Sequence, residues 1–314
     1  MGNAELYKNV IERCFPQLPI YSVKSILEGW DNFILEINRE YIFRFPRRPA
    51  VVPQLEREIE LLPELAKTIS VPIPLFEFVW KAKEELPSVF VGYRKIDGVP
   101  LKKDHLKSPR EIHLAQQLAR FLSELHSFPV QQAARLAIPD ANPEQWQQKY
   151  INLYRQVKLR IYPMLTEGER AKTVLLWEDF LKNEANFRFQ SVMLHGDLSE
   201  EHILCNVDKE TLTGIIDWGD ACIGDPALDF AWLLDYGNTF IEEVLGSYKG
   251  VIDGTFLQRA IFYSRIGSFF EILFGLDTYD NVHIKQGLDY LRLELPGWSA
   301  VQCQATSSTQ KSES

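Results

Sequence analysis

The chain contains the stretch LHGDLSEEHIL at residues 194–204, and this stretch is the strongest indication of the fold. Short apolar segments flank its polar centre on both sides, and such segments predict strands. The sequence therefore predicts a loop between two strands that presents Asp197 and His202.

A second stretch, IIDWGD at residues 215–220, begins with another apolar run and places Asp217 twenty residues after Asp197. Phosphoryl transfer needs a group that orients or deprotonates the attacking hydroxyl, and a cation that neutralises the phosphate oxygens. Two loop aspartates with an imidazole between them in sequence supply both requirements.

The N-terminal third predicts strands. Apolar residues alternate with other residues over 33–37 and again over 41–45, with a short turn at 38–40, and this period of two is typical of half-buried strands. A helix is predicted over 54–66, where Pro63 should cause a kink or an early end.

From about residue 108 the pattern becomes helical, with short strands around the two motifs. Thr166 and Glu169 form a predicted capping box, and Asp225 followed by proline predicts a helix from 226. The predicted fold class is α+β, a two-lobed protein kinase-like fold. Its expected parts are a nucleotide-binding lobe at 1–96 with a connector at about 94–98, a helical lobe at 97–303 and a disordered tail at 304–314.

Composition excludes several classes of protein. The net charge of −9 argues against a nucleic-acid partner, and no apolar run is long enough to cross a membrane. The four cysteines form no CxxC pair, which predicts free thiols and a cytoplasmic location. A monomer is expected.

The two motifs resemble those of the aminoglycoside phosphotransferase family. That family has His-Gly-Asp with a metal ligand five residues beyond the aspartate, then Ile-Asp-Phe/Trp-Gly and a Gly-Asp-Pro-x-x-Asp segment, here residues 224–229. The resemblance covers about residues 25–275. It implies a kinase that transfers the γ-phosphate of ATP or GTP to an alcohol, with Asp197 as catalytic base.

The resemblance also implies that His202 and Asp217 hold Mg²⁺, with Mn²⁺ as an alternative. The usual ligand at the first of these positions is asparagine, and its replacement by histidine is shared by the 2''-aminoglycoside and macrolide kinases. His195 is expected to support the loop, and Asp229 is expected to brace it as a structural carboxylate.

The N-terminal lobe supplies the expected nucleotide site. Strand alternation places Arg44 opposite its phenylalanine neighbours, where kinase-like enzymes use a lysine on the phosphates; its expected partner is Glu58, with Glu60 as the fallback. The bulky Tyr93 at the gatekeeper position makes GTP a candidate donor. The other nucleotide-binding residues implied by the resemblance are Gly29, Asn32, Arg94 and Ile96.

The sequence determines the identity of the acceptor molecule less well than it determines the fold or the catalytic residues. A cationic aminoglycoside requires carboxylates near the base, and the candidates besides Asp197 are Asp220, Asp235 and Glu271. A macrolide site would be wider and more apolar. Residues 44–49 look like the macrolide kinases, whereas residues 218–221 look like the 2''-aminoglycoside kinases.

Three other functions remain open. A metabolic kinase for choline, homoserine or a sugar would keep the same fold and motifs. A catalytically dead binding module is disfavoured by the intact Asp197, His202 and Asp217. A metallohydrolase is disfavoured because the remaining histidines form no metal-ligand pattern.

Overall fold

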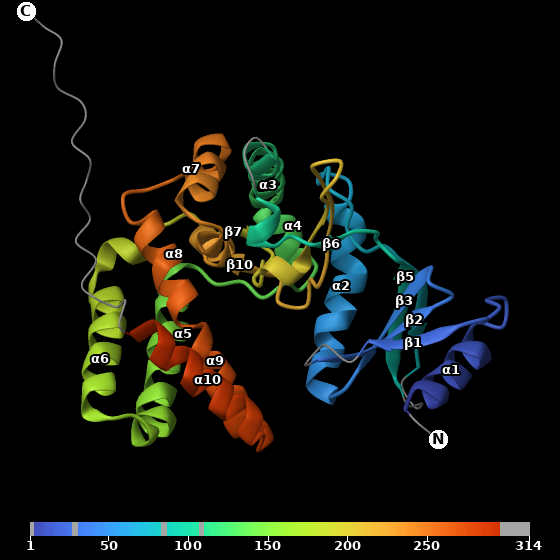
Figure 1. The fold of residues 1–314 in the computed structure, drawn as a ribbon, viewed down its shortest axis with the longest axis horizontal. Helices are drawn as coiled ribbons and strands as arrows, with labels where there is room; N and C mark the ends of the chain where they lie inside the picture. Colours follow the sequence, from blue (N-terminus) through green and yellow to red (C-terminus); the bar gives the residue numbers. More distant parts are fainter. Residues whose placement is uncertain (1–2, 27–30, 83–86, 107–109, 296–314) are drawn as a thin grey trace, which may run out of the picture. The chain divides into compact units, whose positions relative to one another are not determined.

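The computed structural model describes residues 3–26, 31–82, 87–106 and 110–295. The chain forms two compact units: residues 1–146 with 189–260, and residues 147–188 with 261–314 (Figure 1). The expected lobe boundary near residue 96 lies within the first unit and stays a prediction. The expected tail at 304–314 lies outside the described residues.

An antiparallel five-stranded sheet forms much of the N-terminal region, in the order β1-β2-β3-β5-β4. Asn38 and Arg39 both have positive φ, 57° and 59°, in the turn between the second and third strands. The predicted turn is therefore confirmed, and an asparagine is well suited to its first left-handed position. The strands are β1 (Val23–Ile26), β2 (Asn32–Ile37), β3 (Tyr41–Pro46), β4 (Phe76–Lys81) and β5 (Val89–Arg94).

Two helices cover opposite faces of this sheet. Helix α1 (Asn3–Cys14) packs Ile11 into a cluster that includes Phe43 and Phe90. Helix α2 (Val52–Leu65) packs against Val89 and Val91, whose side chains alternate with that of Phe90. Figure 1 shows the two helices on either side of the strands.

Helix α2 contains Pro63 and ends only two residues later, at Leu65. Proline removes one backbone donor and crowds the preceding turn. Its position in the last turn limits that cost, and the fully buried Leu61, Leu62 and Leu65 hold the turn against the sheet and its surroundings.

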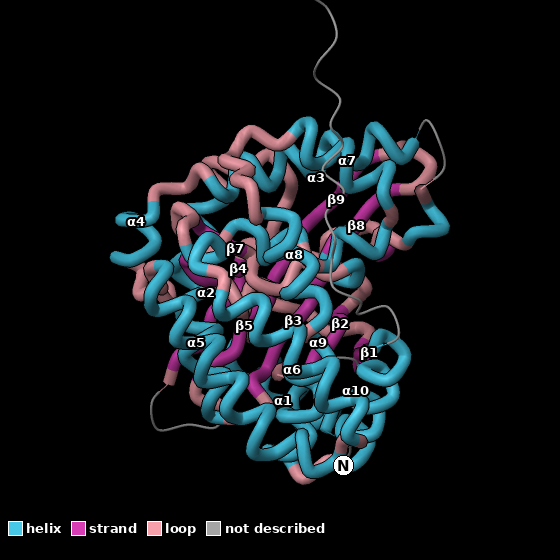
Figure 2. The backbone as a smooth tube through the Cα atoms, turned by 90° about the vertical axis from the view of Figure 1, so that its left-hand side faces the viewer, coloured by secondary structure: helices cyan, strands magenta, loops and turns pink. Residues whose placement is uncertain are grey.

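The rest of the first unit combines helices with short strands. Helix α3 packs against α7 and β9 (Figure 2). The strands form one sheet in the order β6-β8-β9 and a pair β10-β7. The elements are β6 (Val99–Pro100), α3 (Arg110–His126), α4 (Val130–Arg135), β7 (Val192–Leu194), β8 (Ile203–Asn206), β9 (Thr211–Ile215), β10 (Cys222–Gly224) and α7 (Asn238–Ser247).

The helix expected from residue 226 is shorter and tighter than predicted. Two 3₁₀-helices, Pro226–Phe230 and Trp232–Tyr236, stand where an α-helix was expected. The cap itself is confirmed, because the Asp225 carboxylate accepts a hydrogen bond from the amide of Ala227. Because these 3₁₀-helices are short and tightly wound, the buried carboxylates of Asp225 and Asp229 can contact different hydrogen-bond partners.

The second unit is helical and built from two separate segments. Its core stacks Phe180 on Phe262, with ring centroids 3.6 Å apart, and the predicted capping box of Thr166 and Glu169 is present. None of the helices in the described residues has the length and apolar character needed to cross a bilayer. The helices are α5 (Pro143–Gln156) and α8 (Phe256–Arg265), which both begin in the first unit, and α6 (Glu167–Lys182), α9 (Gly267–Thr278) and α10 (Asn281–Glu294).

Candidate active site

The loop between β7 and β8 presents Asp197, whose side chain is 39% exposed. The buried carboxylate of Asp229 fixes the start of this loop by accepting hydrogen bonds from the amides of His195 and Gly196, each at 2.9 Å. Gly196 has φ of +88°, and a Cβ there would lie 2.2 Å from the carbonyl oxygen of Asp220. Only glycine fits this position without displacing the backbone.

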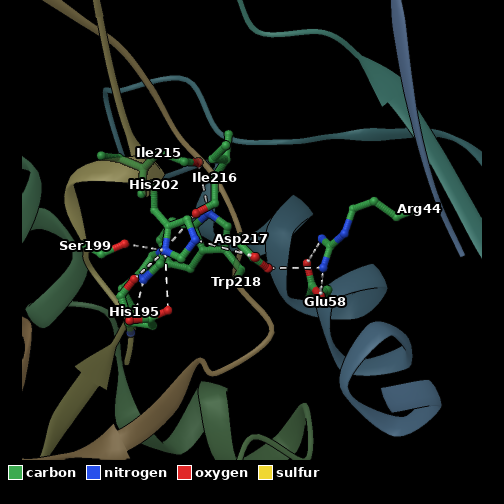
Figure 3. Close-up of polar contacts among 10 residues, drawn as sticks. Arg44, Glu58, His195, Ser199, His202, Ile215, Ile216, Asp217 and Trp218 are labelled. Atoms are coloured by element: carbon green, nitrogen blue, oxygen red, sulfur yellow. Dashed lines mark hydrogen bonds and ion pairs between the residues drawn. The ribbon is translucent and has the colours of Figure 1, made fainter. Parts of the chain in front are cut away.

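His202 lies at the end of the same loop, where its Nε2 faces Asp217 (Figure 3). Its Nδ1 faces Asp197. Its Nδ1 lies 2.7 Å from the carbonyl oxygen of Asp197, which can only accept, so Nδ1 carries a proton in this bond. In the neutral ring Nε2 is then an acceptor, and it lies 3.6 Å from Asp217 Oδ2.

Asp217 follows β9 and adopts φ of 62°, a left-handed conformation that is uncommon for residues other than glycine. Its side chain is 52% exposed and accepts a hydrogen bond from Arg44 at 3.2 Å. Desolvation alone would raise the pKa of Asp217, but opposing effects, of which the charge of Arg44 is the largest, lower that pKa.

Arg44 and Glu58 form the buried ion pair that the sequence predicted. Arg44 Nη1 and Nη2 donate to the two carboxylate oxygens of Glu58 at 2.6 and 3.1 Å, and both side chains are at most 5% exposed. Burial raises the pKa of Glu58, and the guanidinium of Arg44 acts against it. Glu60, the fallback partner, pairs instead with Lys81 at 3.5 Å.

The acceptors at His202 Nε2 and Asp217 Oδ2 fit a shared divalent cation, because two electron-pair donors face each other with no hydrogen of their own between them. Asp197 faces the other nitrogen of the ring. Within the described ranges there is no group of three or more His, Cys, Asp or Glu side chains placed to hold a metal ion. The site therefore offers a pair of protein ligands, and a separate aspartate beside them.

Comparison with known proteins gives the chemistry of this family. Residues 22–255 match the model of a family described as "Phosphotransferase enzyme family". The chain belongs to this phosphotransferase family. It is 28% identical over 298 residues to the viomycin phosphotransferase of Streptomyces vinaceus, which covers 88% of this chain and 98% of that protein.

Solved structures of phosphotransferases resemble most of the chain. The GDP and kanamycin complex of APH(2'')-IIia is 32% identical, with a TM-score of 0.86, and the match covers 93% of this chain and 99% of that one. The macrolide 2'-phosphotransferase MphH of Brachybacterium faecium is 20% identical, with a TM-score of 0.71, over 92% of this chain and 97% of that one, and it supports the fold alone. The kinase-like fold and the family resemblance are thus confirmed.

His195 of this phosphotransferase is fully buried. Its Nε2 donates to the carbonyl oxygen of Ile216 at 3.0 Å, and its Nδ1 faces the amide of Asp197 at 3.4 Å. Burial lowers the pKa of His195, which keeps the ring neutral. These contacts join the two motif loops and agree with the supporting role expected for this residue.

The residues that the sequence predicted to bind the nucleotide differ in how far they are buried and in what they contact. Tyr93 is buried on β5, and its register pairs it with Ile42 on β3; burial raises the pKa of Tyr93 to about 12. Ile96 packs close over Gly214 in the adjoining sheet. Arg94 is exposed, and its side chain hydrogen-bonds Glu40 and Tyr41.

Asn32 and Gly29 belong to the segment expected over the phosphates. Asn32 is 6% exposed, and its amide oxygen has no hydrogen-bond partner among the residues that the structure describes. Gly29 lies outside the described residues.

The predicted acceptor-binding carboxylates belong to both units of the chain. Asp220 is exposed and lies beside Gly196 in the loop region. Asp235 is exposed in the second 3₁₀-helix, and desolvation raises its pKa against the charge of Lys103. Glu271 belongs to the second unit, where it hydrogen-bonds His283 at 2.6 Å.

Sequence reasoning missed three residues that support the loops of the phosphotransferase. The ring of His126 lies between Tyr248 and Asp229, and Arg259 binds Asp225 from within the core. The sequence feature that could have revealed Arg259 is its position among apolar residues of a helix. A buried arginine there requires a carboxylate partner. Tyr248 gave no signal, because it follows the end of a helix without a motif.

Proposed function

We propose that this phosphotransferase transfers the γ-phosphate of ATP or GTP to a hydroxyl group of an aminoglycoside. One observation carries the proposal: Asp197 stands exposed beside His202, while Asp217 lies on the other side of the same ring and contacts Arg44. In this proposal Asp197 is the base, His202 and Asp217 form the cation site, and Arg44 contacts the phosphates. Each of these side chains contacts the next.

Asp197 accepts the proton of the attacking hydroxyl or orients that hydroxyl. His202 and Asp217 hold Mg²⁺, or Mn²⁺ as the alternative, which when bound neutralises the phosphate oxygens. Arg44, fixed by Glu58, contacts the phosphates. Tyr93, Arg94 and Ile96 receive the base along the connector, and Asn32 and Gly29 belong to the phosphate loop.

The acceptor follows from charge and similarity together. The relative of 32% identity is described in complex with kanamycin and GDP, and this chain carries a net charge of −9, which favours a cationic acceptor. Asp220, Asp235 and Glu271 are the proposed carboxylates for it. The protein acts as a cytoplasmic monomer in this proposal.

A turnover panel tests the acceptor. Release of ADP or GDP is measured with Mg²⁺ and kanamycin, gentamicin, viomycin, erythromycin, choline, homoserine or a hexose, after thermal-shift screening of each nucleotide. Turnover with kanamycin or gentamicin is expected. Turnover with erythromycin alone would make the protein a macrolide kinase, and turnover with a small alcohol alone would make it a metabolic kinase.

Replacement of Arg44 by lysine tests the phosphate contact. Lysine keeps the charge but loses the fork that holds both Glu58 oxygens and Asp217, so kcat/KM for the nucleotide should fall roughly tenfold, the value of about one charge-assisted hydrogen bond. The matched control is Glu60→Gln on the same helix, which should leave kcat/KM unchanged. Equal kcat/KM for Arg44→Lys and the wild type would remove Arg44 from the nucleotide site.

A further inference from the structure

We propose that Tyr248 and His126 are positioning residues for phosphotransfer, acting through Asp229 on the loop that carries Asp197. The inference rests on the proposed role of Asp197. It assigns a function to two side chains on separate elements, one at the end of α3 and one just beyond α7.

The three side chains form a continuous buried line of hydrogen bonds. The hydroxyl of Tyr248 lies 2.6 Å from His126 Nδ1, and His126 Nε2 lies 3.1 Å from Asp229 Oδ2. All three residues are at most 8% exposed. Water therefore has little access to replace any member of the line.

Asp229 and Tyr248 together determine which nitrogen of His126 carries the proton. The Asp229 carboxylate only accepts, so it requires the proton on Nε2, and the neutral ring then needs a donor at Nδ1. The Tyr248 hydroxyl supplies it, since burial raises the pKa of Tyr248 and keeps the hydroxyl protonated. Without that hydroxyl, Nδ1 is a buried acceptor that has lost its donor, and the ring is held only by its bond to Asp229.

The loop responds because Asp229 is shared. Its Oδ2 accepts from His126 and from the amide of His195, and its Oδ1 accepts from the amide of Gly196. These two amides immediately precede Asp197. When the His126 ring is held less firmly, the carboxylate of Asp229 can shift toward its two amide donors, and the position of Asp197 shifts with it.

Gly250 places Tyr248 against the histidine. A Cβ at residue 250 would lie 2.1 Å from the Tyr248 hydroxyl oxygen and 2.2 Å from the ring carbon that bears it. Gly250→Ala should therefore push the ring aside while every side chain of the line stays chemically intact. By contrast, a Cβ at Gly254 in the same segment meets nothing within 4 Å.

Steady-state kinetics of two variants and two controls test the positioning role. The assay contains GTP, Mg²⁺ and either kanamycin or the acceptor that gives the highest turnover in the panel. Tyr248→Phe and Gly250→Ala should each lower kcat roughly tenfold, with both KM values within about twofold, because small displacements of a reacting group cost rate more than binding. The double variant should be no slower than the slower single variant, since both act through one contact.

The controls separate positioning from general loss of stability. Gly254→Ala makes the same change where space is open. Tyr162→Phe removes a hydroxyl whose partner is Tyr154, in the second unit. Both should keep the wild-type kcat. A wild-type kcat in Tyr248→Phe, or an equal loss in either control, would overturn the proposal.

Histidine NMR gives a readout that does not depend on turnover. With ¹⁵N-labelled histidine, and with His126→Gln to assign the signal, the wild type should show His126 protonated on Nε2 and accepting at Nδ1, and Tyr248→Phe should shift that signal. A wild-type ring protonated on Nδ1 would overturn the proposal. If the wild type turns over no acceptor, the proposed function fails while this measurement still decides the hydrogen-bond line.

Discussion

Asp197→Asn is expected to lower kcat by roughly 10²- to 10⁴-fold, the usual contribution of a general base. The amide is nearly the same size as the carboxylate but cannot take up a proton from the acceptor hydroxyl. The nucleotide contacts proposed here lie at Arg44, His202 and Asp217, so nucleotide affinity should change little. Steady-state kinetics and a thermal shift with GTP and Mg²⁺ measure the two quantities separately.

Asp208→Asn is the matched control for this prediction. It makes the same chemical change at an exposed aspartate in the turn between β8 and β9. This control should have the kcat of the wild type. If Asp197→Asn also has that kcat, another group activates the hydroxyl and the proposed mechanism is wrong.

Arg259→Met should cost about 3–5 kcal/mol of unfolding free energy, the range for breaking a buried ion pair from one side. Arg259 is fully buried and binds Asp225 at 2.7 and 3.1 Å, and Asp253 at 2.7 and 2.8 Å. Methionine fills much of the space but leaves the buried Asp225 charge without the guanidinium. Urea unfolding measures the loss.

Two comparisons make this stability prediction specific. Arg188→Met removes an exposed arginine paired with Glu184, and should cost less than about 1 kcal/mol. The double variant Arg259→Met with Asp225→Asn should recover part of the loss, because the unpaired charge is gone while the cap can remain. Equal stability of Arg259→Met and the wild type would show that the ion pair contributes nothing net.

Through Asp253, Arg259 also makes the free energy of unfolding depend on pH in the acid range. Burial would raise the pKa of Asp253, but its hydrogen bonds, chiefly from Arg259, lower it. A lowered pKa in the folded state contributes stability above the unfolded value of about 3.9, and that stability is lost as the pH falls through the folded value. Arg259→Met should therefore lose less stability than the wild type as the pH falls below the unfolded value of about 3.9.

The sequence allowed the prediction of features that depend on local patterns. The short strands around Asp197 follow from apolar runs. The face of Arg44 follows from strand alternation, and its partner Glu58 was expected from the resemblance to kinase-like enzymes. Each of these features depends on residues that lie close along the chain or on a motif with fixed spacing.

The remaining features depend on packing between distant segments. Tyr248 and His126 are more than a hundred residues apart, and Arg259 reaches Asp225 through the core. The expected α-helix from 226 became two 3₁₀ turns because the buried carboxylates at 225 and 229 bind different partners. Propensity and periodicity contain no information on such partners.

The division of the second unit into two segments has a consequence for synthesis of the chain. Phe180 leaves the ribosome more than eighty residues before Phe262, the ring on which it stacks. At about 5–20 residues per second, this delay is roughly 4–16 s. During that time the apolar side chains of α5 and α6 lack the later segment of their unit, so this stretch of the nascent chain exposes apolar surface that chaperones can protect.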